Sequence, residues 1–96
     1  MKVFLSDKAR SDLLQFHGYL AERSPSAARA RLETINVKFA NLTRFPFIGR
    51  ERSTLGAGVR SLVAGAQVIF YTVEKERIII VRVLDGRRDI DEEFKR

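Results

Sequence analysis

Apolar positions recur at helical spacing in the first half of the chain and cluster into strand-like runs in the second half. Residues 2–5 form a short, mostly apolar run that is typical of a strand. A first apolar stripe follows at intervals of four, three and four residues, at Ala9, Leu13, Phe16 and Leu20. This spacing aligns the four side chains on one face of a helix.

A second and longer helix is predicted from a clearer stripe at Ala28, Leu32, Ile35, Phe39 and Leu42. Ser6 and Ser24 each supply a side-chain oxygen that can cap a helix at its start. Pro25 ends the first helix and fits the first position of the second. A link this short predicts an antiparallel hairpin. The stripes are typical of a core, and would form a partner groove if the layer above them is incomplete.

Strand-like runs dominate the remainder of the chain. Residues 45–50 break the helical pattern, and the segment that continues to Gly58 is polar and brings the glycines to three, so residues 45–58 are predicted to form a loop. The runs that follow span 59–63, 67–73 and 78–84. Connections of three or four residues join antiparallel neighbours, and the last run is apolar on both faces, as an inner strand is. Asp89 can then cap a short helix that contains Ile90 and Phe94.

The predicted fold class is α+β, in the order β-α-α-β-β-β with a short C-terminal helix. The helical hairpin is expected to pack on a mainly antiparallel sheet. A length of 96 residues fits one domain, which we assign to residues 1–96. No internal repeat or linker interrupts this pattern.

Composition excludes several classes of chemistry. The chain has no Cys, which removes disulfides, thiolate catalysis and Cys-ligated metal sites. Its single histidine, His17, falls within the first predicted helix, and no Gly-rich phosphate loop is present. We therefore expect no metal and no cofactor. The apolar runs are too short for a membrane span, and the N-terminus lacks the apolar core of a signal peptide, so we expect a cytoplasmic protein.

Positive charge is the remaining feature, with 18 Lys and Arg against 12 Asp and Glu and a net charge of +6. The candidate binding residues are six arginines in the second half: Arg50, Arg52, Arg60, Arg82, Arg87 and Arg88. Guanidinium groups grip carboxylate or phosphate at two points, although a solvated basic face explains the same charge. Arg82 interrupts the most apolar strand, so it must pair, for example with Asp85 or Asp89, or point into a cleft.

Together these residues resemble the ParE/RelE superfamily of toxins from type II toxin–antitoxin pairs, and specifically its ParE branch. The matching residues are Leu5-Ser6, Ala9, Asp12-Leu13, Ser24-Pro25, Ala27-Ala28, Phe45-Pro46, Gly49-Arg50, Val59-Arg60-Ser61, Ile69-Phe70-Tyr71, Arg82-Val83-Leu84 and Gly86 to Ile90. Their order and spacing, which run along almost the whole chain, carry the resemblance.

The resemblance implies a cytoplasmic toxin that causes growth arrest, serves plasmid stabilisation and is held inactive in a hetero-oligomer. The implied partner is a ParD-like antitoxin, whose acidic C-terminal tail wraps the toxin while its ribbon-helix-helix dimer binds operator DNA. The toxin itself would meet operator DNA only indirectly, and no membrane is implied. We expect the antitoxin over the helical hairpin and a sheet edge. The candidate contacts are Leu13, Phe16, Leu20, Leu32, Ile35 and Phe39.

Two target mechanisms follow from the two branches of the superfamily. The ParE branch implies inhibition of DNA gyrase by binding, whereas the RelE branch implies ribosome-dependent cleavage of mRNA. Cleavage requires groups that move protons, and the segment after Arg82 offers neither His nor Tyr. The two tyrosines are Tyr19 and Tyr71. We therefore expect a binding inhibitor of gyrase rather than an enzyme, with the six arginines as target-binding candidates. A plain nucleic-acid-binding domain is the third hypothesis, and no aromatic platform supports it.

Overall fold

The computed structural model describes residues 1–95. Its elements are β1 (Lys2–Leu5), α1 (Asp7–Arg23), α2 (Pro25–Arg44), β2 (Arg50–Glu51), a 3-10 turn (Ser53–Leu55), β3 (Arg60–Ala64), β4 (Gln67–Glu74), β5 (Arg77–Asp85) and α3 (Ile90–Lys95). The predicted α+β class and order of elements are confirmed. The predicted loop at 45–58 is wrong in part, because it contains β2 and the 3-10 turn.

Both long helices begin at the predicted caps. The Ser6 hydroxyl accepts a hydrogen bond from the Ala9 amide at 3.0 Å, and the Ser24 hydroxyl accepts one from Ala27 at 3.3 Å. Each such cap stabilises a helix by about 1 kcal/mol. Pro25 lies in the first turn of α2, where its missing N–H leaves no bond unmade. Local signals therefore fix where the two helices start.

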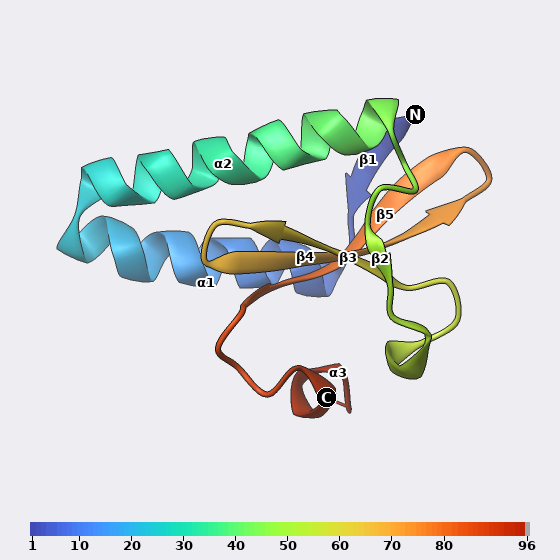
Figure 1. Ribbon diagram of the computed structural model, residues 1–96. Helices are drawn as coiled ribbons and strands as arrows, with labels where there is room; N and C mark the ends of the chain where they lie inside the picture. The colour runs from blue at the N-terminus through green and yellow to red at the C-terminus, as the bar shows by residue number, and fades with distance from the viewer. Residues whose placement is uncertain (96) are drawn as a thin grey trace.

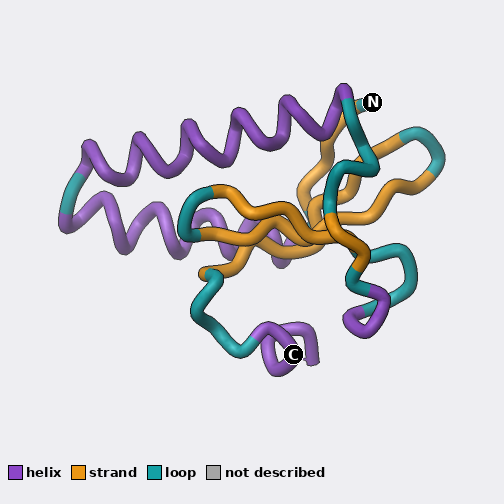
Figure 2. Tube along the Cα trace, in the orientation of Figure 1, coloured by secondary structure: helices purple, strands orange, loops and turns teal. Residues whose placement is uncertain are grey.

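The five strands form one mixed sheet in the order β1-β5-β4-β3-β2. β1 runs parallel to β5, and the other three pairs are antiparallel. β5 lies between β1 and β4, which confirms that the most apolar run is an inner strand. Figure 1 shows the hairpin of α1 and α2 along one side of the sheet and α3 beyond the opposite side, and Figure 2 gives the same layers by element type.

Each face of the sheet carries its own apolar cluster, because neighbouring side chains on a strand point to opposite faces. Ile69 and Tyr71 of β4 face the hairpin and pack with Ile35 of α2. Phe70, between them, faces the other way and meets Phe94 of α3 edge to face, with ring centroids 5.0 Å apart. Ile90 and Phe94 of α3, together with Leu55 of the 3-10 turn, thus cover the apolar cluster on the second face of the sheet.

A bulge in β5 changes which side chains share a face. Phe70 pairs with Arg82 whereas Tyr71 pairs with Ile80, so Val81 is the extra residue. Because of this insertion, Ile80 and Val83 both join the cluster under the hairpin although they lie three positions apart. Arg82 is thereby placed on the open edge of β5 beyond the end of β1.

None of the helices in residues 1–95 has the length and apolar character needed to cross a membrane.

Candidate functional site

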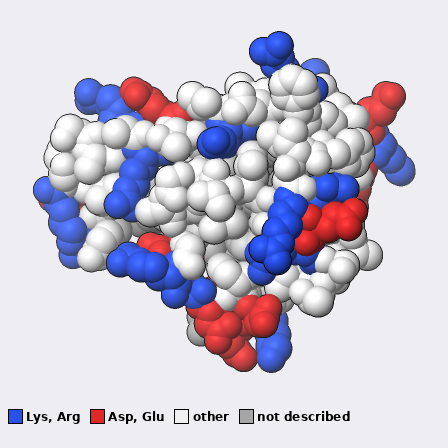
Figure 3. Space-filling model, in the orientation of Figure 1, with Lys and Arg blue, Asp and Glu red and all other residues white. Residues whose placement is uncertain are grey.

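A groove of about 600 Å³ lies between α1, the first half of α2 and the C-terminal end of β5. Its apolar wall includes Phe16 and Leu20 of α1, and its rim carries Arg31, Arg87 and Arg88. The other residues that line the groove are Asp12, Gln15, Tyr19, Gln67, Val83, Leu84 and Asp85. Figure 3 shows basic side chains gathered on the left of this face, and acidic ones below it around α3.

The groove thus unites residues that the sequence analysis assigned to different partners. Phe16 and Leu20 were predicted antitoxin contacts, and Arg87 and Arg88 were predicted target contacts. Sequence reasoning missed Arg31, which lies on the polar side of the α2 stripe and comes to the groove only because the two helices are antiparallel. A basic rim over an apolar wall suits an acidic segment that carries apolar side chains.

Gln67 adds a polar group to the inner wall of the groove. The residue is 4% exposed, and its side-chain amide has no hydrogen-bond partner among residues 1–95. No fully buried side-chain nitrogen or oxygen within residues 1–95 lacks a hydrogen-bond partner, so the unpaired Gln67 amide is in reach of solvent in the groove. The amide can therefore serve as a hydrogen-bonding anchor for a polar group that enters the groove.

Asp85 and Arg87 set the charge at the mouth of the groove. The Arg87 guanidinium donates hydrogen bonds of 3.1 Å to both carboxylate oxygens of Asp85, and the Arg87 backbone amide donates a third at 2.9 Å. These bonds hold the pKa of Asp85 below its usual value. Arg87 itself is 90% exposed, so it can exchange this partner for a carboxylate of a bound protein.

Arg82 has a structural role that joins α1, β5 and α3. Its Nε and Nη2 atoms each donate to Asp12 at 2.8 Å, and Nη1 donates to the Glu93 carbonyl at 2.9 Å. The pKa of Arg82 is raised, chiefly by its hydrogen bonds to Asp12. Asp12 also accepts the Val83 amide at 3.0 Å on the open edge of β5. An internal pair was one of the two alternatives that the sequence left open for Arg82; the partners named as examples, Asp85 and Asp89, were wrong, because Arg82 pairs with Asp12 and Glu93.

Arg60 holds the segment that follows α2. Its Nη1 atom donates to the Gly49 carbonyl at 2.8 Å and the Phe47 carbonyl at 3.2 Å, and Nη2 donates to Glu51 at 3.3 Å. On the inner side, the Gly49 amide donates to the buried Tyr71 hydroxyl at 2.8 Å. Burial raises the pKa of Tyr71, so the phenol stays protonated well into the alkaline range.

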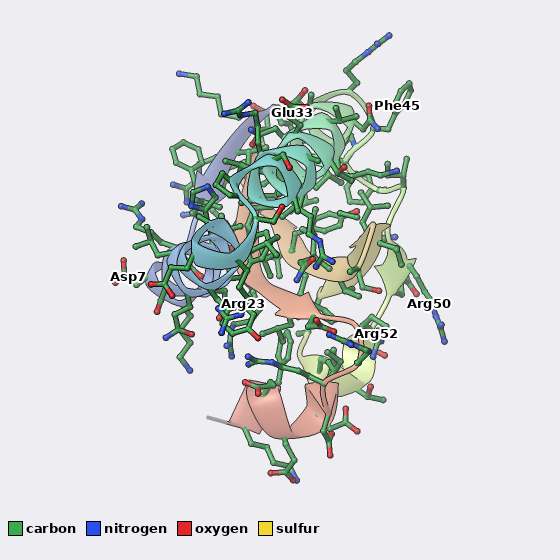
Figure 4. All side chains as sticks on the ribbon, turned by 90° about the vertical axis from the view of Figure 1, so that its left-hand side faces the viewer. Asp7, Arg23, Glu33, Phe45, Arg50 and Arg52 are labelled. Atoms are coloured by element: carbon green, nitrogen blue, oxygen red, sulfur yellow. The ribbon has the colours of Figure 1, made fainter. Side chains whose placement is uncertain are left out.

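The remaining predicted arginines differ in how many contacts their side chains make within the protein. Arg52 lies over the Phe70 ring and reaches the Ser61 hydroxyl at 3.5 Å. Arg88 donates to the Glu93 carboxylate at 3.2 Å and remains 55% exposed. Arg50 is exposed on β2, with no ion pair or hydrogen bond from its side chain within residues 1–95. Figure 4 shows Arg50 extending away from the molecule.

The predicted antitoxin contacts on the helices also divide into two groups. Leu13, Phe16 and Phe39 are partly buried and pack against the core, and Ile35 is 1% exposed. Leu20 and Leu32 are partly buried as well. Ile35 is therefore corrected to a core residue, because the sheet covers the stripe that carries it. Only Phe16 and Leu20 of the six line the groove.

The part of the chain that the structure describes holds no cluster of three or more His, Asp or Glu side chains that could bind a metal ion. His17 is exposed on α1, outside the groove lining. Of the two tyrosines, Tyr71 is buried under Gly49, whereas Tyr19 lines the groove. Arginines, carboxylates, glutamine amides and one phenol therefore supply the side-chain polar chemistry of the groove.

Two solved structures of toxin–antitoxin systems share the fold of this chain. The fold matches a chain of the chromosomal ParDE toxin–antitoxin system from P. aeruginosa with a TM-score of 0.74 and 22% identity, over 88% of this chain and 95% of that one. It also matches a chain of the RelBE2 toxin–antitoxin complex from Mycobacterium tuberculosis with a TM-score of 0.61 and 25% identity, over the same shares. The two structures show that the fold is shared by both branches.

Comparison of sequences, rather than of folds, matches this chain to toxins of the ParE branch. The toxin ParE3 of Caulobacter vibrioides is 36% identical over 63 residues, which make up 66% of this chain and 63% of that protein. The match therefore spans less than two thirds of the relative's length. The protein-family model that describes the ParE toxin of the type II toxin–antitoxin system parDE matches residues 3–90 of this chain. The chain belongs to the ParE toxin family of type II toxin–antitoxin systems.

Proposed function

We propose that this chain is a toxin that arrests growth by binding DNA gyrase in the cytoplasm and is neutralised by a ParD-like antitoxin. The observation that carries the antitoxin half of the proposal is the groove, which combines an apolar wall with a basic rim. The antitoxin would meet operator DNA through its own ribbon-helix-helix dimer. Toxin and antitoxin would form a hetero-oligomer.

The chemistry of the groove fits the acidic, amphipathic tail of such an antitoxin. Phe16 and Leu20 offer an apolar wall for side chains on one face of the tail. Arg31 and Arg87 lie where carboxylates on its other face would be neutralised. The Gln67 amide can pair with a backbone or side-chain oxygen that enters the groove. Wall, rim and anchor each match one feature of the expected tail.

The contacts and the charge of the arginines support inhibition by binding rather than by catalysis. Arg60 and Arg82 are occupied by bonds that hold the 45–51 segment and α3 in place. Arginine keeps its proton at physiological pH, so these residues cannot act as proton shuttles. The exposed guanidinium group of Arg50, which lies outside the groove lining, suits contacts with an acidic surface of the target.

The proposal is tested with purified toxin, separated from its antitoxin, in a gyrase supercoiling assay. We expect supercoiling to fall as toxin is added and to recover when antitoxin is supplied in equal amount. Unchanged supercoiling at a large toxin excess, together with arrested translation, would overturn gyrase as the target. The antitoxin is sought by co-expressing the neighbouring open reading frame. Failure to obtain a stable complex would reject that pairing.

One observation favours ribosome-dependent mRNA cleavage as the second candidate. The Tyr19 side chain lines the groove beside Arg31 and Arg87, so a phenol and two guanidinium groups share one cavity. A phenol can transfer a proton, and guanidinium groups can stabilise phosphate charge. If this candidate is correct, Tyr19→Phe abolishes mRNA cleavage on ribosomes and leaves antitoxin binding intact.

A further inference from the structure

A second surface, the turn Phe45–Ile48 after α2, carries an unusual density of exposed apolar groups. Phe45 is 55% exposed, Phe47 is 61% exposed and Ile48 is 48% exposed. Single exposed apolar residues need no explanation, but three within four consecutive residues form a patch, and such patches mark interaction sites. Figure 4 shows the Phe45 side chain extending into solvent on the same side of the molecule as Arg50.

The turn is held rigidly although it lies at the surface. The Phe45 amide donates to the Asn41 carbonyl at 2.8 Å, which ends α2. The Ile48 amide donates to the Phe45 carbonyl at 3.2 Å, and Arg60 ties down the Phe47 carbonyl from outside the turn. A partner that binds here does not have to order the loop, so little conformational entropy is lost on docking.

Positive charge surrounds the patch. The Arg44 guanidinium lies 5.6 Å from the centroid of the Phe45 ring, and that of Arg60 lies 5.2 Å from the Phe47 ring. Arg50 follows two residues after the turn and is exposed, with no internal partner in the described chain. Aromatic anchors edged by arginine are the composition that dominates binding energy at protein interfaces.

We propose that the Phe45–Ile48 turn, together with Arg50, is the surface by which this toxin docks on an acidic face of its target protein. This inference rests on the proposed function and assigns the target to a different surface from the antitoxin groove. Arg31, on the groove, and Arg44, at the turn, lie thirteen residues apart on α2, or about 20 Å along the helix.

Other occupants fit the patch less well. A second copy of this chain would bring Arg44, Arg50 and Arg60 against the same three charges, and like charges oppose association. A nucleic acid would need several unoccupied cations along its backbone. The Arg60 guanidinium is already used by Phe47, Gly49 and Glu51, which leaves too few for a polyanion.

The test compares the double variant Phe47→Ser/Ile48→Ser with a matched control, Leu14→Ser/Val37→Ser. The control removes two apolar side chains that are 69% and 58% exposed on the helices. Toxicity is measured as growth arrest on induction, and folding is checked by co-purification with the antitoxin. We expect the turn variant to require about tenfold or more toxin for arrest while its antitoxin complex is unchanged. The control should match the wild type.

A second variant, Arg50→Glu, tests the charge without altering an internal contact, and we expect it also to weaken toxicity. Full toxicity in both variants would overturn the assignment of the turn. Loss of RNA binding in the turn variant, in a gel-shift assay where the control binds, would overturn it in favour of a nucleic-acid platform. If the wild type arrests growth with normal supercoiling, gyrase is refuted as the target, and reduced arrest by the turn variant still supports the turn.

Discussion

Removal of the Asp12 carboxylate should lower the free energy of unfolding markedly, because the Asp12–Arg82 pair is the hub that joins α1, β5 and α3. Its side chain is 10% exposed, and that of its partner Arg82 is 11% exposed. Asp12→Ala removes two guanidinium bonds of 2.8 Å and the acceptor of the Val83 amide at 3.0 Å. A nearly buried guanidinium and a backbone amide are then left without this partner.

The size of this loss in unfolding free energy depends on which bonds Arg82 keeps after Asp12 is removed. Breaking a buried ion pair on one side costs on the order of 3–5 kcal/mol, since the other charge stays in a poorly solvated place. Arg82 keeps the Glu93 carbonyl at 2.9 Å and the Glu93 carboxylate at 3.7 Å, which favours the lower end of that range. We therefore expect a loss of about 3 kcal/mol, or on the order of 12–20 °C in Tm for a chain of this size.

Urea denaturation followed by circular dichroism measures this loss. The matched control is Glu92→Ala, which removes an exposed carboxylate whose one ion pair within residues 1–95 is with exposed Lys95, and it should leave the midpoint unchanged. A loss of less than about 1 kcal/mol for Asp12→Ala would refute the hub, because such a value is typical of a solvent-exposed pair.

Three further predictions address other contacts. Gly49→Ala should cost on the order of 2–3 kcal/mol in urea denaturation, because its Cβ would stand 2.5 Å from the Tyr71 hydroxyl; an unchanged midpoint would contradict this packing. The lowered pKa of Asp85 stabilises the fold above the unfolded pKa of about 4, and this contribution disappears as the pH falls through the folded pKa. Asp85→Asn should therefore flatten the acid limb of stability against pH, and an unaltered limb would argue against the bonds from Arg87. Arg31→Glu should weaken the antitoxin complex about tenfold in calorimetry and reduce its salt dependence, whereas undiminished affinity would place the tail elsewhere.

Local signals in the sequence were sufficient for the helices and the three long strands. Ser6, Ser24 and Pro25 act within one helical turn, so their effect on helix starts can be predicted without knowledge of the fold. The strand β2 could not be predicted, because two residues carry no periodicity and pair only through β3. The bulge at Val81 is equally invisible, since it depends on the register that β4 imposes on β5.

The sequence predicted which types of residue form the site, but it did not predict which of them lie together in the fold. If Arg82 paired, the partners that the sequence suggested lay within seven residues, whereas Asp12 lies 70 positions away and reaches Arg82 only because β5 lies beside α1 in the fold. Arg31 and Gln67 come to the groove from separate elements in the same way. The composition predicted a basic surface, but which arginines surround the groove depends on how α1 packs on the sheet.

The most direct test of the account is a titration of gyrase with toxin, because the central claim is inhibition by binding rather than by turnover. Supercoiling activity is measured at fixed gyrase over a range of toxin concentrations, with antitoxin added back at each point. The account predicts inhibition that grows in proportion to toxin, saturates at a fixed molar ratio and is reversed by antitoxin. Unimpaired supercoiling at saturating toxin, with mRNA cleaved on ribosomes by trace amounts of the same preparation, would contradict it.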